Sequence, residues 1–252
     1  MPGLSREGIP GYTRLYWPAF FQAEPPMTTL LALDTATEAC SVALLHEGRV
    51  LSHYEVIPRL HAQRVLPMIR DLLAEAGVAL SAVDAIAFGR GPGAFTGVRI
   101  AVGVVQGLAF ALERPVLPVS NLAVLAQRAL REQGARQVAA AIDARMDEVY
   151  WGCYREEQGE MRLAGIEAVL PPEQACLPRD ATGDWFGAGT GWGTYGARIP
   201  LHLCGQDPGM LPHAQDLLSL AGFAWARGEA VIADQAQPVY LRDKVATPKA
   251  AP

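Results

Sequence analysis

The stretch LALDTATEACSVAL, residues 31–44, combines a short apolar run that ends at Asp34, a polar turn and a second apolar run. Residues 46–48 form a glycine-containing turn, and residues 49–56 give a third strand pattern that Pro58 breaks. Short apolar segments bounded by turn residues are typical of β-hairpins. The sequence therefore predicts an antiparallel β-meander at this point of the chain.

The same order of features begins again near residue 138. Residues 138–142 are apolar and end before Asp143, and a polar turn, a strand pattern, a glycine turn and another strand pattern follow. An internal repeat of this kind predicts two similar α/β domains. We expect the first domain over residues 27–120 and the second over residues 121–252.

The helices are expected between and after these strand patterns. Apolar residues at spacings of three and four predict a helix over residues 61–76, and Gly77 is suited to end it. Ser120 or Asn121 is expected to cap the helix over residues 121–133. The remaining segments, in chain order, are a strand at 83–88, helices over 97–112, 121–133 and 213–227, and an extended tail, PVYLRDKVA, at 238–246.

The overall composition excludes some classes of protein. The chain has 252 residues, of which 50% are hydrophobic, and a formal net charge of -5. Because phosphate neutralisation dominates nucleic-acid affinity, the acidic balance argues against a stand-alone RNA-binding module. The four cysteines form no CxxC pair, and no uninterrupted apolar run reaches the ~18 residues of a membrane span. We interpret residues 1–26 as a flexible leader, or as sequence ahead of a true start at Met27.

The glycine-rich loop GRGPGAFTGVR, residues 89–99, lies between a predicted strand and a predicted helix. Helix N-termini attract anions, and glycines let a phosphate approach the backbone. The loop nevertheless lacks the lysine of a P-loop, and Thr96 replaces the last glycine of a dinucleotide fingerprint. The pattern favours a tight turn that packs a helix on a sheet, and a weak anion or nucleotide contact stays open. That contact would use Asp34, Gly91, Gly93 and Gly97.

Asp34 and Asp143 each follow the first strand of a repeat. Carboxylates at such positions serve in phosphate chemistry when neighbouring glycines make room for the phosphate. Here Asp34 is followed by TAT and Asp143 by ARM. The alternative function, a nucleotide-dependent phosphotransferase or hydrolase, is therefore disfavoured. We expect both carboxylates to accept hydrogen bonds from backbone amides of their own turns.

No other group of residues indicates catalysis or metal binding. A helical metal site needs a second ligand one turn after His61, and that position is Val65. No GxSxG nucleophile motif is present. The sequence therefore predicts no catalytic residue and no bound metal.

The helix over residues 97–112 is apolar on nearly every side. Only Arg99 and Gln106 are strongly polar, and Gly103 and Gly107 form a small strip along it. A helix on the outside of a soluble protein normally keeps a polar face. Either the helix is buried within the chain, or part of it binds a partner, and periodicity does not decide between the two.

Three strings resemble one known family. They are LALDTATEACSVAL at residues 31–44, GRGPGAFTGVRIAVGVVQGLA at 89–109 and the tail PVYLRDKVA. The chain is similar in these strings to TsaB, the bacterial accessory protein of tRNA threonylcarbamoyladenosine synthesis. The resemblance implies a two-domain, actin-like and sugar-kinase-like (ASKHA) α/β fold with a duplicated ribonuclease-H-like core. It also implies a non-catalytic scaffold subunit, a degenerate relative of the catalytic subunit TsaD.

The resemblance further implies the partners. TsaB-like proteins bind and activate a TsaD-like subunit, a TsaE-like ATPase joins the assembly, and the protein alone forms a homodimer through the same surface. The chain would need no cofactor of its own because the partner subunits use ATP, and it would meet tRNA only through the complex, in the cytoplasm.

Mapped onto this sequence, the docking surface would lie on the helices over residues 61–76 and 97–112. We expect Val102→Glu or Val105→Glu to leave the chain folded and to abolish pairing. The interface residues expected on this basis are Val65, Met68, Ile69, Leu72, Val98, Val102, Val105, Gln106 and Ala109.

Overall fold

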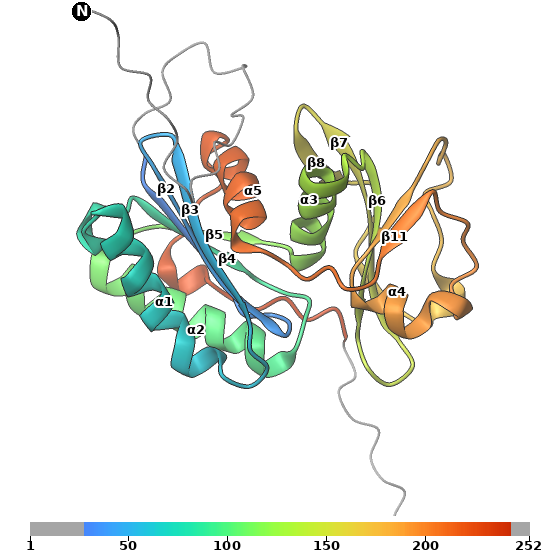
Figure 1. The fold of residues 1–252 in the computed structure, drawn as a ribbon, viewed down its shortest axis with the longest axis horizontal. Helices are drawn as coiled ribbons and strands as arrows, with labels where there is room; N and C mark the ends of the chain where they lie inside the picture. The colour runs from blue at the N-terminus through green and yellow to red at the C-terminus, as the bar shows by residue number, and fades with distance from the viewer. Residues whose placement is uncertain (1–27, 243–252) are drawn as a thin grey trace, which may run out of the picture.

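A computed structural model describes residues 28–242. The expectations for residues 1–26 and for the last part of the tail lie outside this range. Two β-sheets stand side by side, and helices α3 and α5 are packed between them (Figure 1).

The first sheet has the strand order β3-β2-β1-β4-β5. Strands β1, β2 and β3 are antiparallel and form the predicted meander, whereas β4 and β5 run parallel to β1. The strands are β1 (Leu30–Asp34), β2 (Ala39–His46), β3 (Arg49–Val56), β4 (Ala85–Gly89) and β5 (Val116–Val119). Every residue of β1 and β4 is buried, as expected for strands covered on both faces.

The second sheet repeats this plan. Its order is β8-β7-β6-β10-β11, with β6, β7 and β8 antiparallel and β10 and β11 parallel to β6. The strands are β6 (Gln137–Asp143), β7 (Val149–Glu157), β8 (Glu160–Leu163), β10 (Phe186–Ala188) and β11 (Gly205–Asp207), while β9 (Ala168–Leu170) pairs with β7. The duplicated α/β core predicted from the sequence is confirmed.

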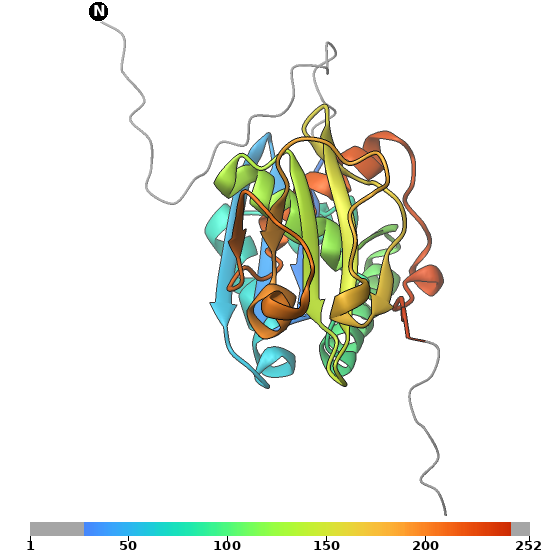
Figure 2. The same ribbon diagram turned by 90° about the vertical axis from the view of Figure 1, so that its right-hand side faces the viewer.

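Helices cover both faces of each sheet. Helices α1 (His61–Ala76) and α2 (Phe95–Leu112) pack on one face of the first sheet, and α5 (Ala214–Ala226) packs on its other face. Helix α3 (Asn121–Gln133) packs on the second sheet, and α4 (Thr190–Tyr195) lies on the face turned toward the viewer in Figure 2. We call the first sheet with α1, α2 and α5 the first lobe, and the second sheet with α3 and α4 the second lobe.

The division expected at residue 120 places α5 in the second domain, whereas its side chains pack on β1, β2, β4 and β5 of the first sheet. The chain thus returns to the first lobe after completing the second sheet. Short 3-10 helices occur at Leu80–Ala82, Pro172–Gln174, Gly196–Arg198 and Ala233–Gln235.

Local sequence explains where several helices begin and end. The Ser120 side chain accepts a hydrogen bond from the Leu122 amide at 3.2 Å, so Ser120 is the cap of α3. Gly77 ends α1 in the left-handed conformation, as predicted. Helix α2 begins at Phe95, two residues before the expected Gly97.

Helix α2 is the one helix among residues 28–242 that is long and apolar enough to cross a membrane, with a mean hydropathy of 1.7 over its 18 residues. Arg99 and Gln106 interrupt its apolar run, which is why the sequence pattern did not indicate such a segment. One side of α2 packs on β4, and its residues enter the core of the first lobe.

Candidate docking face and the closed glycine loop

The interface residues expected on α1 and α2 lie mostly inside the first lobe. Eight of the nine are no more than 7% exposed and belong to its hydrophobic core: Val65, Met68, Ile69, Leu72, Val98, Val102, Val105 and Ala109. These residues follow the helical stripe that packs on the chain's own sheet. The predicted docking residues are therefore wrong in detail, because periodicity identifies the buried stripe and not the exposed one.

Gln106, the ninth expected residue, is partly buried and bonded within the chain. Its side-chain amide donates a hydrogen bond to the backbone oxygen of Ala236 at 2.9 Å. Ala236 is fully buried and belongs to the same core. Gln106 therefore fixes the segment after α5 onto α2.

The outer face of α2 remains apolar after its inner stripe is buried. Gly103 and Gly107 are exposed, and a Cβ built on either would meet nothing within 4 Å. Phe110, on the same side, is 79% exposed. Ile100, Val104 and Leu108 flank the glycines and are only partly buried. An open strip of backbone bordered by apolar side chains is a feature of helix–helix contact surfaces.

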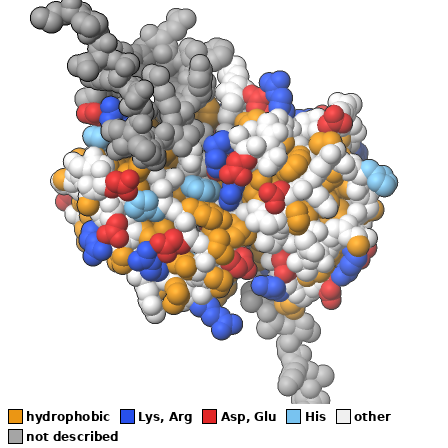
Figure 3. All heavy atoms as spheres, in the orientation of Figure 1, with side chains coloured by type: hydrophobic (Ala, Val, Ile, Leu, Met, Phe, Trp, Pro, Cys, Tyr) orange, Lys and Arg blue, Asp and Glu red, His pale blue; other side chains and the backbone are white. Residues whose placement is uncertain are grey.

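Helix α1 contributes a more polar border to this face. Leu66 is 49% exposed, but Arg64 pairs with Glu55, and Arg70 pairs with Asp71 at 2.7 Å. In Figure 3, charged and hydrophobic side chains alternate over the lower left, where α1 and α2 lie in Figure 1. The apolar part of the face is therefore centred on α2. We call Ile100, Gly103, Val104, Gly107, Leu108 and Phe110 the α2 outer face.

Asp34 is fully buried at the carboxyl end of β1. It accepts hydrogen bonds from the Ala36 amide at 3.1 Å and from the Asn121 side-chain amide. Burial raises the pKa of Asp34 from 3.8 to about 6, although both hydrogen bonds act in the opposite direction. Its oxygens are therefore occupied within the fold.

The glycines of the loop make room for the chain itself. A Cβ on Gly93 would lie 2.4 Å from the Ala36 oxygen, and one on Gly97 would lie 2.1 Å from the Thr35 oxygen. The Thr35 hydroxyl donates to the Gly97 oxygen at 2.7 Å, and the Ala94 amide donates to the Ala36 oxygen at 2.7 Å. The turn after β1 thus fills the concave side of the loop.

The possible anion or nucleotide contact does not match this arrangement. Gly91 and Gly97 are buried, and the Gly91 amide donates to the Asn121 side-chain oxygen at 2.8 Å. The loop is the tight packing turn that the sequence favoured. Asp34, Gly91 and Gly97 are hydrogen-bonded to other parts of the chain, and Gly93 packs against Ala36, so the structure brings the four residues to one turn that the chain itself fills.

Asp143 plays the same local role in the second lobe. It accepts a hydrogen bond from the Arg145 amide at 2.8 Å, two residues ahead, just as Asp34 does from Ala36. The prediction that both carboxylates bind amides of their own turns is confirmed. Within residues 28–242, no three His, Cys, Asp or Glu side chains lie close enough to hold a metal ion.

Comparison with known proteins places the chain in a family. A family model described as "TsaD: tRNA N6-adenosine threonylcarbamoyltransferase" matches residues 53–188. The "tRNA threonylcarbamoyladenosine biosynthesis protein TsaB" of Escherichia coli is 48% identical over 87% of this chain and 97% of its own length. The chain belongs to the TsaB family. A solved structure described as "YeaZ from Pseudomonas aeruginosa" is 80% identical, with a TM-score of 0.83 over 85% of this chain and all of the other.

A second Pseudomonas aeruginosa structure is also 80% identical, with a TM-score of 0.84 over 86% of this chain and all of the other. It is described as an uncharacterized protein with similarity to peptidase YeaZ. The actin-like and sugar-kinase-like fold expected of a TsaB-family chain agrees with the two repeated sheets.

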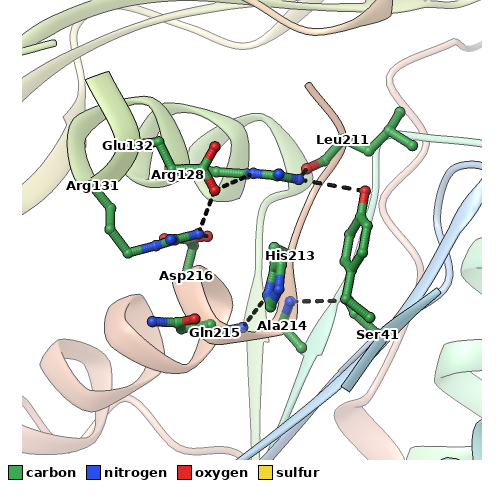
Figure 4. Close-up of polar contacts among 10 residues, drawn as sticks. Ser41, Arg128, Arg131, Glu132, Leu211, His213, Ala214, Gln215 and Asp216 are labelled. Atoms are coloured by element: carbon green, nitrogen blue, oxygen red, sulfur yellow. Dashed lines mark hydrogen bonds and ion pairs between the residues drawn. The ribbon is translucent and has the colours of Figure 1, made fainter. Parts of the chain in front are cut away.

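Sequence reasoning missed a polar cluster between the lobes of this TsaB-family chain (Figure 4). Arg131 on α3 donates two hydrogen bonds, each of 2.7 Å, to the buried Asp216 on α5. Arg128 donates to the Leu211 oxygen at 2.8 Å. His213 caps α5 by accepting from the Gln215 amide at 3.0 Å.

The ring of His213 also stacks on Tyr54 of β3, with centroids 4.7 Å apart and planes 5° from parallel. Burial, together with the charges of Arg128 and Arg131, lowers the pKa of His213 from 6.5 to about 3. The cluster fastens α3 to α5 and thereby one lobe to the other. Its members lie up to 162 residues apart, from Tyr54 to Asp216, so no local pattern in the sequence could have grouped them.

Proposed function

We propose that this chain is a non-catalytic scaffold subunit of tRNA threonylcarbamoyladenosine biosynthesis. It binds a TsaD-like catalytic subunit through the α2 outer face and holds that subunit in its active form. A TsaE-like ATPase joins the assembly, ATP is consumed by the partner subunits, and tRNA is bound by the complex as a whole.

The observation that carries the proposal is the exposed, side-chain-free strip at Gly103 and Gly107. A Cβ at either position would meet nothing within 4 Å, so another helix backbone can approach closely there. The helix that bears the strip is the one helix of residues 28–242 that is long and apolar enough to cross a membrane, yet only 33% of its residues are buried. Exposed apolar surface of this kind is a mark of a protein-binding site.

A non-catalytic role is supported by the way the fold uses its polar residues. Among the described residues, Asp34 and the glycine loop most resemble a phosphate-binding site. The space beside them is occupied by the chain's own backbone and by the Asn121 side chain. A phosphotransferase would need these atoms to face a nucleotide. The alternative of a nucleotide-dependent phosphotransferase therefore has less support than the scaffold.

The names of similar proteins support the choice of system. The Escherichia coli and Haemophilus influenzae relatives are both named tRNA threonylcarbamoyladenosine biosynthesis protein TsaB, at 48% and 46% identity. The family model that matches residues 53–188 names a threonylcarbamoyltransferase. A chain that shares the fold of a transferase but whose candidate phosphate site is closed is suited to act beside that transferase.

Gly103→Glu and Gly107→Glu test the docking face directly. Both sites have room for a side chain, and glutamate favours a helix over glycine by roughly 0.5–1 kcal/mol, so the variants should fold. Each would place a charge in the middle of the apolar strip. We expect both to abolish co-purification with the TsaD-like protein of the same genome and to abolish threonylcarbamoyladenosine formation on tRNA in the reconstituted system.

Gly196→Glu is the matched control. Gly196 has helical backbone angles, φ -53° and ψ -36°, lies in the second lobe, and also has nothing within 4 Å of its Cβ position. It should pair with the TsaD-like subunit and support modification as the parent chain does. Normal pairing by both α2 variants would refute the docking face, and tRNA modification that proceeds without this chain would refute the scaffold role.

The same surface should mediate self-association when the chain is alone. We expect the parent protein to sediment as a homodimer, and Gly107→Glu to sediment as a folded monomer. A dimer that survives Gly107→Glu would place self-association on another face.

A further inference from the structure

The segment formed by residues 238–242 contacts both lobes. In Figure 1 the chain after α5 passes α2 and ends between the lobes. This segment is the described part of the tail PVYLRDKVA. Partner docking on α2 does not account for it.

The segment is bonded first to the glycine loop. The Val239 amide donates a hydrogen bond to the Arg90 oxygen at 2.8 Å. Gly91 has a φ of +104°, and a Cβ there would lie 2.8 Å from the Val239 oxygen. The loop therefore needs glycine at position 91 both for its backbone angle and for the passage of the segment.

Tyr240 fastens the segment to the beginning of α2. The Arg99 Nε donates to the Tyr240 hydroxyl at 2.8 Å. The Arg99 guanidinium also lies 3.7 Å from the centre of the Phe95 ring, and the Phe95 and Tyr240 rings are 5.7 Å apart. The guanidinium lies 5.8 Å from the centre of the Tyr240 ring, so the cation and the two tilted rings form one cluster on the first lobe.

Arg242 fastens the other end to the second lobe. Its Nη2 donates to the Ala144 oxygen at 3.1 Å and the Arg145 oxygen at 3.3 Å, and it pairs with Glu148. These residues belong to the turn between β6 and β7. Arg145, Met146 and Asp147 there have φ values of 61°, 56° and 59°.

Three consecutive non-glycine residues in the left-handed region need support from outside the turn. Arg242 supplies part of that support by binding two carbonyl oxygens and one carboxylate of the turn at once. All three of these contacts are made by Nη2, while Nη1 of the same planar guanidinium donates to the Met146 sulfur at 3.5 Å, so both prongs of the fork lie on the turn.

Both anchoring points lie just past the carboxyl end of a strand that belongs to the parallel part of its sheet. Arg90 follows the end of β4, and Ala144 follows the end of β6. Ligands of open α/β sheets bind outside the carboxyl ends of the strands. The segment thus runs across the position where such a sheet would hold a ligand, and it touches both lobes there.

We infer that residues 238–242 are an intramolecular strap that takes the place of a ligand between the lobes and holds them in a fixed relative position. The strap couples the start of α2 to the turn at residues 144–148. Loosening one anchor therefore loosens the other, although the two anchors lie on different lobes. The inference is independent of partner binding and is tested on the isolated full-length chain.

Hydrogen–deuterium exchange followed by mass spectrometry tests the coupling. Arg242→Gln removes the second-lobe anchor, and Tyr240→Ala removes the first-lobe anchor. We expect each variant to raise exchange by about tenfold at residues 89–97 and at residues 144–148 alike, with the central strands unchanged. Arg155→Gln is the control, because Arg155 pairs with Asp180 at 2.9 Å entirely within the second lobe.

The pattern of exchange decides the outcome. If each variant affects only its own anchor, the segment is a surface contact and the strap is refuted. If Arg242→Gln speeds exchange throughout the chain, Arg242→Lys replaces it, because lysine keeps the charge opposite Glu148 and loses the fork. Faster exchange of both segments in Arg242→Lys supports the strap, and faster exchange of residues 144–148 alone refutes it.

Discussion

The side-chain amide of Asn121 donates a hydrogen bond to the buried carboxylate of Asp34. Asp34 ends β1 in the first lobe, and Asn121 is the first residue of α3, which packs on the second sheet. A carboxylate for which the sequence left an anion contact open is thus part of the connection between two lobes. Its carboxylate has a structural role, and that role has consequences for stability.

The ionisation of Asp34 should make stability depend on pH. Its pKa is about 6 in the folded chain and 3.8 ordinarily, because burial disfavours the charge. The folded state therefore binds the proton more tightly, and the stabilisation present below pH 3.8 is lost as the pH rises to about 6, by about 3 kcal/mol in total. Urea unfolding from pH 4 to pH 7.5 should show this loss relative to Asp34→Asn. If the unfolding free energies of the parent and Asp34→Asn changed with pH in the same way, the predicted contribution of Asp34 would be contradicted.

Alanine substitutions should distinguish the packed glycines from the exposed ones. Gly97→Ala would place Cβ 2.1 Å from the Thr35 oxygen, so we expect a loss of more than about 2 kcal/mol of unfolding free energy. Gly103→Ala meets nothing within 4 Å and should raise the unfolding free energy by up to about 1 kcal/mol. Chemical denaturation measures both. A mild effect of Gly97→Ala would mean that the loop is open after all.

Much of the fold could be predicted because the deciding signals are local. The run that ends at Asp34 and the run that ends at Asp143 each specify a strand, a turn and an antiparallel neighbour within about ten residues. Because the two runs repeat the same order of features, they predict the duplicated core. The return of α5 to the first sheet has no such signal, because its contacts are made with strands more than 90 residues earlier in the chain.

The docking face shows the limit of periodicity more clearly. Val105 and Gly103 lie two residues apart on a helix that is apolar all round, and only packing against the sheet decides that Val105 is buried and Gly103 exposed. The hydrophobic side chains of α2 led to the wrong choice of docking residues, because most of them lie on the side of the helix that fills the core. The exposed side carries the glycines, which a hydrophobic pattern passes over.

Val102→Glu and Val105→Glu should therefore unfold the chain and not merely block pairing. Val102 is 7% exposed and Val105 is fully buried, so either carboxylate would be ionised inside the core. We expect a loss of more than about 3 kcal/mol and mostly insoluble protein. Ile166→Glu, at a site that is 79% exposed, is the control and should remain soluble and folded. Circular dichroism and thermal melting of the soluble fractions check this, and a stable, well-folded Val105→Glu protein would contradict the burial.

Removal of Arg131 should be costly because it leaves a charge without its partner. Asp216 is 1% exposed and accepts both of its short hydrogen bonds from Arg131. We expect Arg131→Met to lower the unfolding free energy by about 3 kcal/mol, and Arg131→Met combined with Asp216→Leu to recover most of the loss. A double-mutant cycle by urea unfolding measures the coupling. Additive effects of the two substitutions would show that the pair does not hold the lobes together.

His213 should affect stability in the direction opposite to Asp34. Its pKa falls from 6.5 to about 3 on folding, because burial and then the charges of Arg128 and Arg131 disfavour its protonated form. The unfolded chain binds this proton more readily. The stabilisation is therefore complete above pH 6.5 and is lost as the pH falls toward 3, at up to about 1.4 kcal/mol per pH unit.

Between pH 4 and pH 6 the two groups should partly cancel in the parent protein. His213→Asn keeps a helix-capping side chain and removes the titration, so its unfolding free energy should fall as the pH rises through this range. Asp34→Asn should show the reverse slope, because only His213 then remains of the pair. Urea unfolding at half-unit pH steps measures all three slopes. The two substitutions should change the slope of unfolding free energy against pH in opposite directions relative to the parent. If both change it in the same direction, one of the two buried groups does not titrate as its surroundings require.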